Sequence, residues 1–65
     1  MRKHDEYKER VMLSRSDIAA RLRRIADAVE DGSMMAGQMY VSVPEQARFE
    51  LEVEPHELQV EIKWR

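Results

Sequence analysis

The chain has 65 residues, of which 43% are hydrophobic and 37% are charged, and its formal net charge at pH 7 is −2. This composition excludes a disordered polymer and a membrane span, and the charge gives no bulk attraction to phosphate. Cysteine is absent, which excludes disulfides and thiolate metal ligands and fits a reducing cytoplasm. A chain of this length forms one domain with a thin core, because it buries only roughly 60% of the surface that its unfolded form exposes.

The first predicted element is a strand from Glu6 to Leu13. Residues 1–5 precede it as a flexible N-terminus, and residues 6–65 are expected to form a single domain. Tyr7, Val11 and Leu13 share one parity, and Glu9 interrupts it. Such alternation is typical of a strand with one buried and one wet face.

A helix is predicted from about Arg15 to Asp31. Ser14 can cap the free amides at its start, and Asp17 stands three residues later, in a shortened relative of the Ser-x-x-Glu box. Apolar residues then recur at helical spacing and form one stripe. The glycine that follows Asp31 accepts the left-handed turn after a helix.

Three further strands are predicted after an apparent loop at residues 33–37. Residues 39–43 alternate and stop before Pro44, and residues 47–54 alternate up to Pro55-His56. Residues 57–65 alternate apolar and polar without an error, and the only tryptophan, Trp64, takes the last apolar place. Connections of a few residues favour an antiparallel meander of these three strands.

The order β-α-β-β-β predicts an α+β fold, with one helix packed on one face of a four-stranded, mostly antiparallel sheet. One helix covers one face, so each strand keeps a polar side. The predicted core joins the helix stripe to the apolar positions of the last two strands: Ile18, Leu22, Ile25, Val29, Phe49, Leu51, Val53, Leu58, Val60, Ile62 and Trp64.

The combination of these elements resembles the amphi-Trp domain. The resemblance rests on the helix Ser-x-x-Asp-Ile-Ala-Ala-x-Leu-Arg, the Asp-Gly stop, Val43-Pro44-Glu45, the acidic strand Phe-Glu-Leu-Glu-Val-Glu and the ending Leu-Gln-Val-Glu-Ile-Lys-Trp. It covers about residues 6–65, and its ending is the most specific part. That family consists of short prokaryotic proteins, and the resemblance implies fold and scale but no activity, catalytic residue or cofactor.

No residue pattern indicates catalysis, a cofactor or a metal. His4 and His56 stand at no spacing that gathers metal ligands. The serines occupy a helix start, a helix end and the outside of a strand, and no motif places a histidine and an acid to activate them. The two glycines cannot build a phosphate cradle. We therefore expect a protein that is not an enzyme and binds no cofactor.

The polar residues predict a solvated surface. Glu50, Glu52 and Glu54 share the outer face of one strand. The same face of the neighbouring strand carries Glu61, Lys63 and Arg65, so pairs of opposite charge are expected across the sheet. Arg21, Arg23 and Arg24 form the one basic cluster, and they are the candidate contacts for an alternative function, nucleic-acid binding. The i, i+4 pairs of Asp17 with Arg21 and of Arg23 with Asp27 are expected to cancel much of this charge.

Self-association is the interaction that the sequence favours. Met34 and Met35 are read either as cover for the core or as an adaptable contact surface. The strand of residues 38–43 carries no charge to guard a sheet edge, so the candidate interface consists of Met34, Met35, Met39, Tyr40 and Val41. The expected function is a small cytoplasmic interaction or structural module that forms a homo-oligomer or binds another protein, with no membrane partner.

Overall fold

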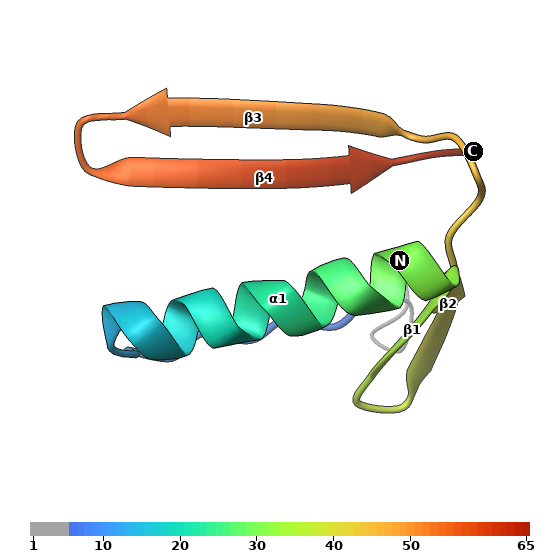
Figure 1. Cartoon of the computed structure of the whole chain (residues 1–65), viewed down its shortest axis with the longest axis horizontal. Coiled ribbons are helices and arrows are strands. Elements are labelled where there is room, and N and C mark those ends of the chain that lie inside the picture. Colours follow the sequence, from blue (N-terminus) through green and yellow to red (C-terminus); the bar gives the residue numbers. More distant parts are fainter. Residues whose placement is uncertain (1–5) are drawn as a thin grey trace.

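The computed structural model describes residues 6–65, so the flexible N-terminus expected at residues 1–5 lies outside the described part. The elements follow in the order α1 (Arg15–Asp31), β1 (Ser33–Ala36), β2 (Met39–Ser42), β3 (Arg48–Glu54) and β4 (Glu57–Lys63) (Figure 1). One helix and four strands confirm the α+β class.

The two ends of α1 are set by the residues that the sequence singled out. The Ser14 hydroxyl accepts a hydrogen bond from the Asp17 backbone N–H at 3.1 Å. At the other end Gly32 adopts φ 89°, and its N–H donates to the carbonyls of Ala28 and Val29. Both caps satisfy backbone groups that the helix itself leaves unpaired, and the predicted bounds are confirmed.

β1 and β2 form an antiparallel hairpin, although residues 33–37 were predicted to be a loop. Ser33 stands opposite Ser42 and Ala36 opposite Met39, so only Gly37 and Gln38 remain for the turn. Gly37 has φ 61°, which a two-residue hairpin turn requires and glycine accepts without strain. The predicted pairing of residues 39–43 with residues 47–54 is therefore wrong.

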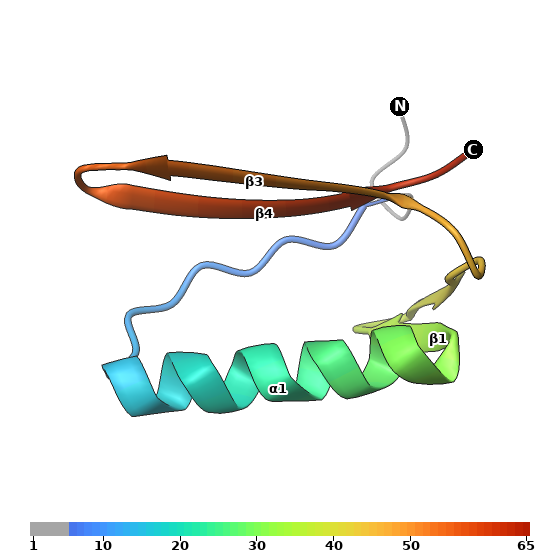
Figure 2. The ribbon, with the colours of Figure 1, turned by 45° about the horizontal axis from the view of Figure 1, so that its top comes forward.

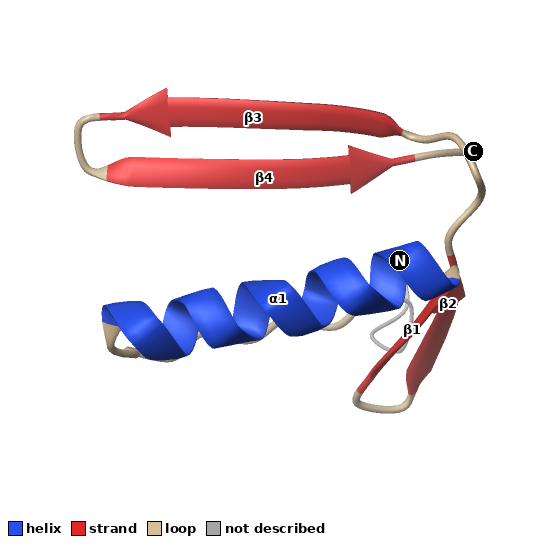
Figure 3. Ribbon diagram, viewed as in Figure 1, coloured by secondary structure: helices blue, strands red, loops and turns tan. Residues whose placement is uncertain are grey.

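β3 and β4 form a second antiparallel hairpin around the turn at Pro55-His56, with Arg48 opposite Lys63. The predicted single four-stranded sheet is wrong, because the two hairpins are separate two-stranded sheets (Figure 3). Pro44 contributes to this separation, since it has no N–H with which to extend the ladder of β2. The connection of residues 43–47 leads from one hairpin to the other.

Residues 6–14 run beside α1 without pairing to any strand (Figure 2). The predicted strand from Glu6 to Leu13 is therefore wrong. Two side-chain contacts hold the segment instead. Arg21 of α1 binds Glu9, and the Tyr7 ring lies against the Gly37 turn, where a Cβ atom would stand only 3.0 Å from it.

The described residues enclose no core. None of them is buried, and α1 packs on β1 while the β3–β4 hairpin stands off on another side of the helix (Figure 1). The radius of gyration is 13.1 Å, whereas a compact domain of this length has about 10.7 Å. The helix predicted to cover the long strands thus does not cover them within one chain.

Removing the helix cap tests the local part of this fold. Ser14→Ala should lower the free energy of unfolding by about 1 kcal/mol, because the Asp17 N–H loses its acceptor. Urea unfolding followed by circular dichroism, at one protein concentration, measures the loss. Ser16→Ala is the control, and its effect should stay within about 0.5 kcal/mol. Equal losses for the two variants would contradict the cap.

Candidate functional site

The residues predicted to form the core are a candidate interaction surface of the single chain, because most of them are exposed. Val29 and Ile62 are half-buried, and the other nine are exposed. Trp64, expected under the helix, keeps 41% of its surface exposed, and Phe49 keeps 64%. Their enclosure stays a prediction that the single chain does not fulfil.

The β3–β4 hairpin carries six of these residues on one face. The register sets Phe49 opposite Ile62, Leu51 opposite Val60 and Val53 opposite Leu58. Each is a cross-strand apolar pair, the unit that stabilises a sheet. Trp64, two residues after Ile62, continues the same parity beyond the end of β4. We call this surface the hairpin face.

The stripe of α1 is the second apolar surface. Arg15, Leu22 and Val29 are spaced by seven residues, and seven residues return to nearly the same side of a helix, within about 20°. Ile18 and Ile25 fill the positions between them. Ile18, Leu22 and Ile25 are exposed at 46%, 51% and 37%. We call this surface the helix stripe.

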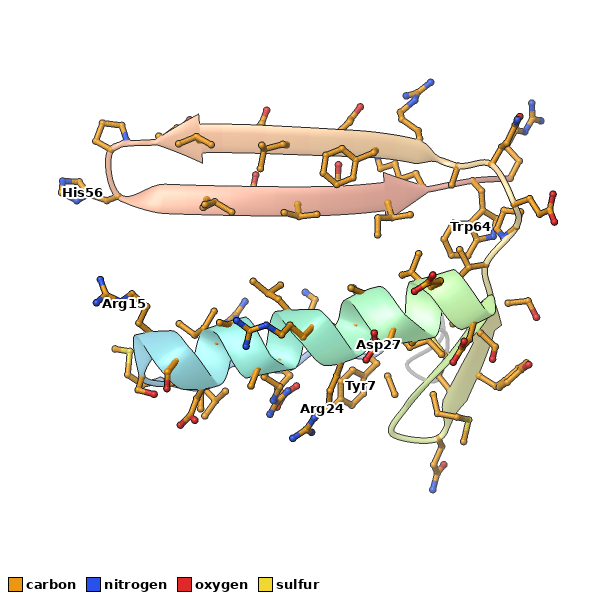
Figure 4. All side chains as sticks on the ribbon, viewed as in Figure 1. Tyr7, Arg15, Arg24, Asp27, His56 and Trp64 are labelled. Carbon is orange, nitrogen blue, oxygen red and sulfur yellow. The ribbon has the colours of Figure 1, made fainter. Side chains whose placement is uncertain are left out.

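The two apolar surfaces face each other without packing together. Figure 4 shows Arg15 extending from α1 on the side of the β3–β4 hairpin, and Trp64 extending from the end of β4 toward α1. Arg15 shares its side of the helix with Leu22, and Trp64 shares the parity of Ile62. The helix contacts β1 as its main partner, so the helix stripe and the hairpin face are both left in contact with solvent.

The residues of the candidate interface at the methionine cluster differ in burial, and both roles that the sequence left open stay predictions. Met34, Met39 and Val41 are half-buried. Met35 and Tyr40 stand opposite each other in the register and are 65% and 63% exposed. They form a small apolar pair on the outer side of the β1–β2 hairpin.

The polar face of the β3–β4 hairpin differs from the predicted pattern of opposite charges. Glu50 stands opposite Glu61, Glu54 opposite Glu57, and Arg48 opposite Lys63. The ion pairs run along the strands instead, with Arg48 Nη1 3.8 Å from Glu50 Oε2 and Lys63 Nζ 3.7 Å from Glu61 Oε1. Because like charges directly across a sheet destabilise it, this register has an electrostatic cost within one chain.

One ion pair fixes the N-terminal segment. Both Glu9 carboxylate oxygens accept hydrogen bonds from the Arg21 guanidinium, at 2.7 and 2.5 Å. These bonds hold the pKa of Glu9 below its ordinary value of 4.5. Of the two expected helix pairs, neither Asp17–Arg21 nor Arg23–Asp27 is among the ion pairs of residues 6–65, and Arg21 binds Glu9 instead.

The arginines of the alternative function do not form one surface. Arg21 and Arg24 line an open hollow of ≈ 530 Å³ together with Tyr7, Ala28 and Met34. Figure 4 shows Arg24 and Tyr7 on one side of α1. Arg23 points away from both, because consecutive residues are about 100° apart around a helix. Nucleic-acid binding stays an alternative prediction, and one of its three arginines, Arg21, is already engaged by the carboxylate of Glu9.

Other polar residues gather into no chemical site in the part of the chain that the structure describes. His56 lies at the tip of the β3–β4 turn (Figure 4). Among residues 6–65 no three His, Asp or Glu side chains are grouped so as to hold a metal ion. Residues 6–65 contain no helix that is long and apolar enough to span a bilayer.

Sequence reasoning missed the contact between Glu9 and Arg21. The two residues are twelve positions apart in different segments, so no helical or strand spacing relates them. A signal was nevertheless present, because Glu9 is the residue that broke the alternation of Tyr7, Val11 and Leu13. A charge on an otherwise apolar face indicates a partner of opposite charge nearby.

The comparisons with known proteins agree with the resemblance found in the sequence. The family model described as the Amphi-Trp domain matches residues 1–65, and the chain therefore belongs to this family. Neither a curated protein nor a solved structure matches the chain significantly.

Acidification should release the N-terminal segment from α1. Because the folded pKa of Glu9 is lowered, its contribution to stability is present above pH 4.5 and disappears as the pH falls through the folded pKa. The Gly37 amide signal in NMR spectra reports the release, since the Tyr7 ring then leaves it. Glu9→Gln should show the released spectrum at pH 7. An unchanged Gly37 signal in that variant would exclude the ion pair as the anchor.

Proposed function

We propose that this Amphi-Trp domain is a small cytoplasmic interaction module, without enzymatic activity, that works by self-association. The observation that supports it is the exposure of its apolar residues. A compact monomer of this mass exposes about 4,300 Å², whereas the chain exposes 6651 Å². An isolated chain with that surface lacks the hydrophobic burial from which folded domains gain most of their stability.

The size of the difference favours a stable partner over a transient one. The excess is about 2,300 Å² per chain, and two chains that removed it would bury about 4,600 Å² together, within the range of obligate dimers. Contiguous exposed apolar residues on a small soluble domain, such as those of the hairpin face, mark an interaction site.

A second copy of the chain suits this surface because each copy carries two apolar surfaces of the same length. α1 has 17 residues and spans about 25 Å, and the seven residues of β3 span about 23 Å. A self-complementary surface is what a two-fold symmetric dimer requires.

Sedimentation equilibrium from micromolar to near-millimolar concentration tests the proposal. We expect a dimer for the wild type. Phe49→Ser should raise the dissociation constant at least about a hundredfold, because each copy loses roughly 1.5–3 kcal/mol of apolar burial. Glu52→Gln, on the opposite face of β3, is the matched control and should leave the dissociation constant nearly unchanged. A wild type that stays monomeric throughout would refute self-association.

Trp64 provides an independent optical test, because it is the only tryptophan. Its 41% exposure in the single chain should fall when two copies associate. Fluorescence emission should therefore move to shorter wavelength as the concentration rises through the dissociation constant, and it should move back on dilution. Emission at one fixed wavelength across the monomer–dimer transition would place Trp64 outside the interface.

A further inference from the structure

We propose that two copies pair their β4 strands antiparallel about a two-fold axis at Val60, which creates one four-stranded sheet in the order β3-β4-β4-β3. The inference rests on the proposed self-association and specifies its interface. In this register residue 57 of one copy stands opposite residue 63 of the other, 58 opposite 62, 59 opposite 61, and Val60 opposite its own equivalent.

The open edge of β4 is the first reason. In the described chain β4 has one neighbour, β3, and the N–H and C=O groups of alternate residues on its other side are left without a partner strand. Such an edge is a template for pairing with another chain. A two-stranded hairpin is itself marginally stable in water, and three or more strands with an apolar face are needed for independent stability.

The charges on the polar face supply the second reason. Within one chain Glu57 stands opposite Glu54 and Lys63 opposite Arg48, so both residues face a like charge. In the proposed register Glu57 stands opposite Lys63 of the second copy, and by symmetry this pair occurs twice. Glu61 stands opposite the neutral Gln59. The dimer thus gives each unfavourably placed residue at the ends of β4 an opposite charge.

Other registers lack this property. An axis at Gln59 would place Glu57 opposite Glu61, and an axis at Glu61 would place that residue opposite itself. A shift by an odd number of positions would set apolar residues opposite polar ones. Pairing through β3 is less favourable, because an axis at any residue from Glu50 to Glu54 sets two carboxylates opposite each other. The axes that avoid this, at Arg48 and Phe49, lie at the start of the strand and pair at most three of its residues.

The width of the apolar side of this sheet then matches the combined width of the two helices that can cover it. Four strands spaced by about 4.8 Å make a face about 19 Å wide. Two helices, each about 10 Å across, cover that width. The two hairpin faces then join into one apolar surface. The helix stripes of the two copies pack on this surface and bury it, which the helix of a single chain does not do. Each Trp64 then lies near the turn of the other copy, at the position of His56.

Charge reversal tests the pairing. Glu57→Lys alone, or Lys63→Glu alone, should raise the dissociation constant at least about tenfold at low salt, because two cross-copy pairs become repulsive. Combining both substitutions in one chain should restore wild-type association. Mixing the two single variants should also restore it, since their heterodimer has only opposite charges at these positions. Added salt should reduce all of these differences.

The same single variants exclude a simple loss of folding. Within a chain each substitution turns a like-charge pair into a pair of opposite charges. Glu57→Lys places a cation opposite Glu54, and Lys63→Glu places an anion opposite Arg48. The hairpin of the monomer should therefore keep or gain strand content, as circular dichroism at low concentration measures. Weaker association with an unweakened hairpin is the expected combination. A single variant that associates as the wild type does would overturn the β4 pairing.

Cysteine substitution tests the axis directly, because the chain has no cysteine of its own. Val60→Cys should form an inter-chain disulfide on mild oxidation, since Cα atoms about 4.5–5.5 Å apart suit that bond. Leu51→Cys is the matched control: it lies on the same face, opposite Val60 in its own chain, but away from the axis. Equal cross-linking of the two variants would overturn the proposed register.

The outcomes separate this inference from the proposed function. A monomeric wild type refutes both. A wild-type dimer that tolerates the charge reversals but is abolished by Tyr40→Lys keeps self-association and moves the interface to the edge of β2. That edge has four residues, and its Val41 is already half-buried in the same chain, which is why we favour the longer edge of β4.

Discussion

The removal of apolar side chains from water is the constraint on which the rest of this structure depends. A chain of 65 residues can enclose only a thin core, and the described residues bury none of their side chains. The apolar residues are nevertheless sorted without error onto one face of the long hairpin and one stripe of α1. This segregation of apolar residues stabilises the protein only if both surfaces are covered and so removed from water.

What holds the single chain together is mostly local. The Ser14 cap, the left-handed Gly32 and the turn at Gly37 each act over a few residues. Glu9 with Arg21 is the one ion pair between distant segments in residues 6–65. Local bonds specify the shape of each element but contribute little cooperative stability, which comes chiefly from buried apolar area. The stability of such a chain therefore becomes linked to its concentration once association buries that area.

Sequence reasoning succeeded where the signal was local and failed where it was not. The helix bounds followed from caps, and the β3–β4 hairpin followed from alternation around Pro55-His56. The β1–β2 hairpin was missed because Gly37-Gln38 is a two-residue turn inside a segment read as a loop. The N-terminal strand was wrong because alternation reports a conformation and a wet face but not whether a neighbouring strand exists. The apolar surface was found residue by residue, but periodicity could not say which chain covers it.

The polar residues of the long hairpin add information that alternation lacks. Alternation excludes every strand register that is shifted by one residue but leaves all shifts by two residues equivalent. Charges distinguish among these, because only some shifts avoid opposing carboxylates. A face with three like-charge pairs within its own chain is a poor arrangement for an isolated hairpin. At the edge of β4, the Val60 register avoids opposed carboxylates and also pairs all seven residues of the strand, so a local cost in each copy becomes a source of specificity in the assembly.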